Sequence, residues 1–210
     1  MGLWARQVVP RLVEVGTGGV EMLAYRRRVC EGLTGRVVEL GFGSGANLEA
    51  LPATVTSLVA IEPSDVAWQL SQQRRDAAGV AGVAVERGGL DGQRLDLPDA
   101  SADAVLSTFT LCTIADADAA LREVVRVLRP GGSLHFFEHG LAPDDDVVRW
   151  QHRLEPLQKR LFDGCHLTRS IDELVERSGL VVDWIERAYA PAPRPMRPWV
   201  YGYLGRARRV

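Results

Sequence analysis

Three alternating glycines follow a short apolar segment that carries a single acidic residue. The segment RVVEL contains Glu39, and Gly41, Gly43 and Gly45 come directly after it. Because glycine has no Cβ, such a loop can turn sharply between a strand and a helix and bring backbone N–H groups against a ligand. The spacing is typical of a loop that binds a nucleotide-type cofactor.

Glu39 bears on the choice between two such cofactors. Gly41, Gly43 and Ala46 also satisfy the G-x-G-x-x-G/A spacing of dinucleotide-binding proteins. A carboxylate at this turn repels the pyrophosphate of a nicotinamide cofactor, whereas S-adenosylmethionine has no phosphate and carries a sulfonium and an ammonium that an acid attracts. The spacing leaves both cofactors open, and Glu39 favours S-adenosylmethionine.

A second carboxylate follows the next apolar stretch of the chain. Residues 55–61 end in Glu62, Pro63 and Ser64. A carboxylate at this position can accept hydrogen bonds from both ribose hydroxyls of an adenosine cofactor. Both candidate cofactors contain that ribose, so Glu62 indicates adenosine without separating them.

Composition indicates a single soluble domain. The chain has 210 residues, 46% hydrophobic and 25% charged, with a formal net charge of −2. A chain of this length forms one core, and its nearly balanced charge gives no reason to expect nucleic acid as a partner. The three cysteines form no C-x-x-C pair, so we expect no disulfide framework, no bound metal and a cytoplasmic location.

The hydropathy of the chain predicts no integral membrane segment. No run of about 18 apolar residues occurs. Residues 3–15 place their apolar positions on one side of a helix, which leaves two alternatives, a lid packed on the cofactor cleft or a peripheral membrane contact. The sequence does not indicate an oligomeric state.

Strand and helix patterns alternate along the chain. The expected strands are 36–40, 55–61, 82–86, 103–108, 133–138, 180–188 and 199–207. The expected helices are 20–31, 46–51, 64–78, 116–128, 143–162 and 170–178. Such alternation predicts an α/β fold, a Rossmann-like doubly wound sheet of seven strands with helices on both faces.

The end of the chain breaks the alternation. The last two strands are joined by APAPRPMRP, which we expect to be stiff and extended, so that the sheet is mostly parallel with an antiparallel last strand. Ligands of such sheets bind at the carboxyl ends of the strands. Four polar or glycine positions follow expected strands and should meet there: Gly41, Glu62, Asp91 and Thr108.

These motifs together resemble a known family. RVVELGFGSGAN, AIEPSD and VLRPGGSLHFFEH resemble, in order and spacing, the class I S-adenosylmethionine-dependent methyltransferases with a type 11 methyltransferase domain. The resemblance implies one domain over residues 1–210. Within it, 1–31 form N-terminal lid helices, 36–140 the cofactor-binding core, and 141–210 the acceptor-side helices and the final strand hairpin.

The same resemblance implies roles for individual residues. Glu39 and the glycine loop face the methionine end of S-adenosylmethionine, Glu62 holds the ribose, and Asp91 lies by the adenine. Thr108 is expected near the methionine, and Thr113 near the adenine or the acceptor. The full expected cofactor set is Glu39, Gly41, Phe42, Gly43, Gly45, Asn47, Glu62, Pro63, Leu90, Asp91, Thr108 and Thr113.

A narrower resemblance comes from the C-terminal half. EHG at 138–140, LFDGCHLTRS at 161–170 and RPWVYGYLGRA at 197–207 are similar to methyltransferase-like proteins whose animal members methylate alkyl thiols. This implies a small, apolar acceptor, with thiol sulfur as the first choice of nucleophile and S-adenosylhomocysteine as the product. Methylation at oxygen or nitrogen of a lipid head group, quinone or phenol is the alternative, and a non-catalytic S-adenosylmethionine-binding module is another.

Two groups of residues are candidates for the acceptor side. A thiol has a pKa of about 8.5, so a modest base suffices to ionise it. We expect His139 to be that base and Glu138 to orient it or line the site, although His139 could equally satisfy a backbone carbonyl in the turn. The expected acceptor-lining residues are Cys165, His166 and Tyr201.

Overall fold

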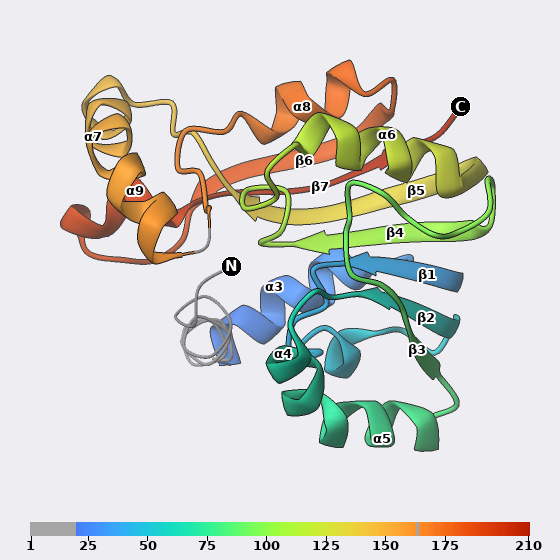
Figure 1. Ribbon diagram of the computed structural model, residues 1–210. Helices are drawn as coiled ribbons and strands as arrows, with labels where there is room; N and C mark the ends of the chain where they lie inside the picture. The colour runs from blue at the N-terminus through green and yellow to red at the C-terminus, as the bar shows by residue number, and fades with distance from the viewer. Residues whose placement is uncertain (1–19, 163) are drawn as a thin grey trace.

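The computed structural model describes residues 20–162 and 164–210, which form one seven-stranded sheet (Figure 1). The strands are β1 (Gly35–Leu40), β2 (Val55–Ile61), β3 (Ala84–Gly89), β4 (Ala102–Thr108), β5 (Leu128–His139), β6 (Val181–Tyr189) and β7 (Tyr201–Arg208). Their order is β3-β2-β1-β4-β5-β7-β6. Strands β1 to β5 pair in parallel, and β7 runs antiparallel to both β5 and β6. The predicted sheet is confirmed.

The strand order of the sheet reverses between β1 and β4. Folds of this kind bind their ligands at such a reversal.

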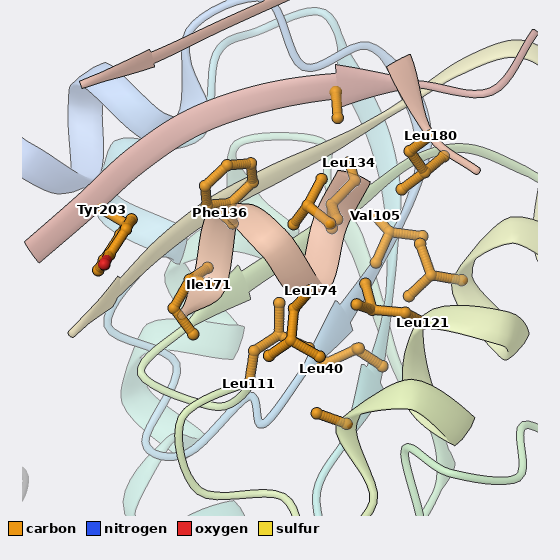
Figure 2. Close-up of a cluster of buried hydrophobic side chains, with 14 of the residues drawn as sticks. Leu40, Val105, Leu111, Leu121, Leu134, Phe136, Ile171, Leu174, Leu180 and Tyr203 are labelled. Atoms are coloured by element: carbon orange, nitrogen blue, oxygen red, sulfur yellow. The ribbon is translucent and has the colours of Figure 1, made fainter. Parts of the chain in front are cut away.

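Each face of the sheet has its own apolar core. Helices α3 (Val20–Cys30) and α5 (Gln72–Val80) pack on one face, and α6 (Ala117–Val127) and α8 (Ile171–Arg177) on the other. Successive side chains of a strand point to opposite faces, so Val37 joins the first core and Val38 the second. Figure 2 shows the second core, in which side chains of α6 and α8 meet those of β4 and β5. The central strands are therefore covered on both sides.

The chain leaves β2 through a capped helix. Helix α4 (Asp65–Leu70) begins after Ser64, whose hydroxyl accepts a hydrogen bond from the Ala67 N–H at 3.2 Å. The expected helix over 64–78 is divided into α4 and α5 at Ser71, whose hydroxyl donates to the Trp68 carbonyl at 2.6 Å. The short helix expected near 46–51 is a 3₁₀ helix, η1 (Leu48–Ala50).

The segment between β6 and β7 differs from the expectation. It contains a 3₁₀ helix, η2 (Arg194–Met196), and helix α9 (Arg197–Val200), so the predicted extended connection is wrong. Proline fixes φ near −65°, which suits the first turn of a helix as well as an extended chain, and a proline opens each of these helices. Ser170 precedes α8, but its side chain makes no capping hydrogen bond.

Helix α7 (Asp145–Leu161) lies beyond the carboxyl end of β5, beside α9 (Figure 1). Buried Gln151 fixes it there, because its amide nitrogen donates to the Gly140 carbonyl at 2.9 Å and to the Pro198 carbonyl at 3.1 Å. None of the helices in the described ranges is long and apolar enough to span a membrane. The predicted lid over residues 1–31 falls mostly outside the described residues, as does the segment 3–15, and α3 is its described part.

Candidate active site

The glycine loop turns the chain at the carboxyl end of β1. Gly41 and Gly43 have φ of 64° and 58°, the left-handed region that side chains disfavour. A Cβ at Gly41 would also lie 2.0 Å from the Thr110 hydroxyl oxygen. The Gly43 N–H donates to Glu62 at 2.6 Å, and the Ser64 N–H donates to the other carboxylate oxygen at 2.7 Å. Glu62 is therefore held at the end of β2, beside the loop.

A buried polar network lies beneath this loop. The Asn47 amide nitrogen donates to Glu39 at 2.6 Å and to the Thr108 hydroxyl at 2.9 Å. Its amide oxygen accepts from the Arg26 guanidinium at 2.6 Å. Sequence reasoning missed Arg26, because it stands in a run of three arginines that is typical of an exposed helix face. The structure brings Glu39, Asn47 and Thr108 together as expected neighbours of the donor's methionine end.

One atom of Glu39 shows what the network can hold. In the described part of the chain, Oε2 of Glu39 is the one buried side-chain nitrogen or oxygen without a hydrogen-bond partner. Burial raises the pKa of Glu39 to about 8, with a further contribution from Glu62, although Asn47 and Arg26 act in the opposite direction. A buried carboxylate oxygen that lacks a donor fits an ammonium group, and S-adenosylmethionine carries one on its methionine part. The residues present fit this cofactor.

The remaining expected donor residues are spread along the edge of the site. Pro63, Leu90 and Asp91 are exposed, and one Asp91 oxygen accepts from the Gln93 N–H at 2.9 Å. The Phe42 ring is buried with its centroid 5.6 Å from that of Trp68, and the Phe42 N–H donates to a backbone carbonyl. The tight turn directs this ring into the core, and the assignment of Phe42 to the cofactor set stays a prediction.

A cavity of about 810 Å³ opens beside the network, between the sheet and the helices at its end. Its wall is mostly apolar and comes from α3, α7, α9 and the last strands; among its residues are Met22, Tyr25, Leu154, Leu157, Trp199 and Leu204. Thr113 and Tyr201 line it as well. A cavity of this size and lining suits a small apolar molecule.

Three side chains with reactive atoms meet on the cavity wall. Cys112 follows β4, His139 ends β5, and Cys165 lies between α7 and α8; their ligand atoms all lie within 4.8 Å of one another. His139 Nε2 is 2.7 Å from the Cys165 sulfur. Burial disfavours the imidazolium, but Cys165 and Glu138 outweigh it and raise the pKa of His139. The neighbouring Cys112 side chain and burial together raise the pKa of the Cys165 thiol. We call these three residues the Cys–His–Cys cluster.

Two expectations about this region are wrong. Glu138 neither orients His139 nor lines the cavity, because neighbouring strand residues point to opposite faces. Its carboxylate accepts instead from the Ser107 hydroxyl at 2.7 Å, the Thr110 N–H at 3.0 Å and the Cys112 N–H at 3.1 Å. It fixes the loop that carries Cys112.

His166 is the second correction. Its Nδ1 lies 3.0 Å from a Glu155 oxygen, and it is not part of the cavity wall. Burial, followed by the charge of Arg169, lowers the pKa of His166. The partner of Cys165 is His139, from a distant strand.

The fold and the donor site are those of Rossmann-like proteins that bind S-adenosylmethionine, and comparison with known proteins agrees. Residues 38–136 match the methyltransferase domain family. The human thiol S-methyltransferase TMT1A is 40% identical over 50% of this chain and 44% of its own length, so the chain spans less than half of that relative. Human thiol S-methyltransferase TMT1B is 33% identical over 82% of this chain and 73% of its own. The chain belongs to this family of S-adenosylmethionine-dependent methyltransferases.

Solved structures show the same fold. A methyltransferase from Bacillus halodurans, 15% identical, superposes with a TM-score of 0.68 over 90% of this chain and 98% of its own. At this identity the likeness concerns the fold alone.

Proposed function

We propose that the protein transfers the methyl group of S-adenosylmethionine to the sulfur of a small apolar thiol. The observation that carries the proposal is the cavity, whose apolar wall bears three sulfur- or imidazole-containing side chains beside the donor network. The names of TMT1A and TMT1B point to the same nucleophile. The protein is proposed to act in the cytoplasm, where its free and buried cysteines stay reduced.

The two substrates are assigned to different parts of the chain. Residues 36–140 hold the donor, with Glu62 on the ribose, Asp91 and Leu90 at the adenine, and Glu39 at the ammonium. Residues 141–210 supply most of the acceptor wall. Helix α3 serves both, because Arg26 belongs to the donor network and Tyr25 to the cavity.

Methyl transfer is an in-line displacement. The acceptor sulfur forms a bond to the methyl carbon while the bond from that carbon to the sulfonium sulfur breaks, and its electron pair stays on S-adenosylhomocysteine. The protein must hold three atoms in line and favour the thiolate form of the acceptor. The apolar cavity beside the donor site would hold the three atoms in line. We assign stabilisation of the thiolate to the Cys–His–Cys cluster.

Release of S-adenosylhomocysteine from purified protein tests this function. The acceptors to compare are an alkyl thiol, a phenol, a hydroxyquinone and a phospholipid amine. We expect turnover with the thiol, and none in Glu62→Ala, which removes the ribose contact. Turnover with an oxygen or nitrogen acceptor alone would replace the thiol in the proposal. Intact donor binding without turnover on any acceptor would favour a non-catalytic binding module.

A further inference from the structure

The Cys–His–Cys cluster is built from three separate segments that the fold holds in place. Glu138 accepts from the Cys112 N–H, and the Cys112 carbonyl accepts from the His166 N–H at 2.8 Å. The loop that carries Cys165 is thereby tied to the loop that carries Cys112. Such anchoring at the backbone is what orients the ligands of a preformed metal site.

A second anchor lies on the same loop. The Arg169 guanidinium donates to the Leu111 carbonyl at 2.5 Å and to the Ile114 carbonyl at 2.8 Å, on either side of Cys112. Cys112 is fully buried, Cys165 is nearly so, and His139 is half-buried, yet all three line the cavity. The protein therefore surrounds the cluster on every side except the one that faces the cavity.

We propose that Cys112, His139 and Cys165 bind a zinc ion whose fourth coordination position faces the cavity and takes the sulfur of the acceptor thiol. This rests on the proposed function. Two cysteines and one histidine, with one open position, form a ligand set of catalytic zinc, whereas structural zinc sites have four protein ligands. No fourth protein ligand is found near these three among the described residues.

Distances in the cluster suit such a site. Tetrahedral zinc with bonds of about 2.3 Å to sulfur and 2.0–2.1 Å to nitrogen places neighbouring ligand atoms roughly 3.6–3.8 Å apart. The three atoms lie within 4.8 Å of one another, and His139 Nε2 is 2.7 Å from the Cys165 sulfur. Metal entry therefore separates this pair by about 1 Å. Rotation of the Cys165 side chain about its Cα–Cβ bond changes the sulfur position by this amount and leaves the anchored backbone in place.

The charge of the two cysteine thiolates also favours a zinc ion at this cluster. Two thiolates in an apolar cavity are costly unless a cation neutralises them, and one divalent ion does so completely. The ion also lowers the pKa of a thiol that coordinates it. The acceptor R–SH loses its proton to solvent as its sulfur binds the metal. After methyl transfer the product is a neutral thioether, a weak ligand that leaves the site.

His139 has a defined part in this scheme. Its Nε2 carries the metal bond, so it acts as a ligand and does not accept the acceptor's proton. A free base would instead accept that proton itself and would need no metal to do so. The two roles of His139 therefore predict different activities for the metal-free protein.

Metal content tests the site without measuring activity. The protein is reduced, stripped with a chelator, dialysed against Zn²⁺ and analysed for bound metal. We expect one zinc per chain in the parent and none in Cys112→Ser, Cys165→Ser or His139→Ala. The matched control is Cys30→Ser, since Cys30 is a buried cysteine of the α3 core outside the cluster, and it should keep its zinc. Unaltered donor binding and circular dichroism show that each variant is folded.

Substitution of cobalt for zinc tests whether the acceptor thiol takes the fourth coordination position of the metal. Co²⁺ in place of zinc gives visible bands characteristic of tetrahedral sulfur and nitrogen ligation, and an alkyl thiol should shift and strengthen them, whereas an alcohol of equal length should not. No stoichiometric metal, or equal metal in the parent and the cluster variants, overturns the proposal. Metal binding that the thiol leaves spectrally unchanged overturns the assignment of the fourth position.

Activity separates this proposal from the function on which it rests. We expect thiol methylation to fall at least tenfold on zinc removal and to return when zinc is added. Full thiol methylation by the metal-free protein would overturn the zinc site and leave the proposed function standing. Bound zinc with no thiol methylation would instead remove the proposed function and, with it, the role of the fourth position.

Discussion

Glu39 links donor binding to proton release. Burial raises its pKa to about 8, so below that pH the free protein holds a proton on this carboxyl. The donor's ammonium favours the carboxylate and expels the proton. We therefore expect S-adenosylmethionine to bind more tightly from pH 6 to pH 7, by up to about tenfold. Calorimetry in buffers of different ionisation enthalpy measures the released proton. Equal proton release by Glu39→Gln would contradict this linkage.

Glu138 is a positioning residue for the cluster. Glu138→Gln keeps the shape of the side chain but loses an acceptor oxygen, so the Cys112 N–H or one of its neighbours is left without its partner. We expect zinc affinity to fall about 10–100-fold. Donor affinity should not change, since Glu138 makes no contact with Glu39 or Glu62. Ser107→Ala, which removes a single donor, is the milder control. Unchanged zinc affinity in Glu138→Gln would exclude this role.

The sequence indicated the donor residues as one set of local motifs, but it did not indicate that the cluster residues come together. Glu39, Gly41 and Glu62 stand in two short segments at the ends of neighbouring strands, where spacing alone carries the information. The Cys–His–Cys cluster joins the ends of β4 and β5 to the loop before α8. Such proximity depends on packing, so the sequence indicated His139 and Cys165 only as separate acceptor-side candidates and did not indicate Cys112. The metal that we now propose at this cluster reverses the sequence expectation of none.

At the scale of elements, the turn after β1 depends on glycine. Gly41→Ala places a Cβ 2.0 Å from the Thr110 hydroxyl oxygen and forces a side chain into a backbone with φ of 64°. We expect Gly41→Ala to lose donor binding and its free energy of unfolding to fall by about 1–3 kcal/mol. Gly79→Ala is the matched control, because its Cβ meets nothing within 4 Å in α5 and should stabilise the protein by about 0.5–1 kcal/mol. Denaturant unfolding of both variants measures the difference.

The elements of the sheet were predictable because their signals are local. Apolar runs bounded by glycine or a cap mark β1, β2 and α4, and the apolar positions of α6 recur at helical spacing. The segment between β6 and β7 lacked such a signal. Proline there is compatible with both an extended chain and the start of a helix, and the packing of α9 beside α7 decides. The result places Trp199 on the cavity wall.

At the scale of the whole molecule, one fold holds two sites that share a boundary. The donor network lies at the ends of β1, β2 and β4, where the strand order reverses. The cavity lies beyond β5 and β7, under α7 and α9. Both sites include residues of α3. Changes in the outer wall of the cavity should therefore alter the acceptor without altering the donor.

Leu154→Trp tests this separation. Leu154 is a half-buried residue of α7 on the cavity wall, and the larger indole reduces the space for an alkyl chain. We expect the KM for a long alkyl thiol to rise about tenfold, because one part of its chain no longer fits the cavity. The affinities for a short thiol and for the donor should not change. Leu70→Trp, on α4 and away from the cavity, is the control. An equal rise for short and long thiols would indicate that the acceptor chain lies elsewhere, because only a chain that fills this cavity meets the added ring.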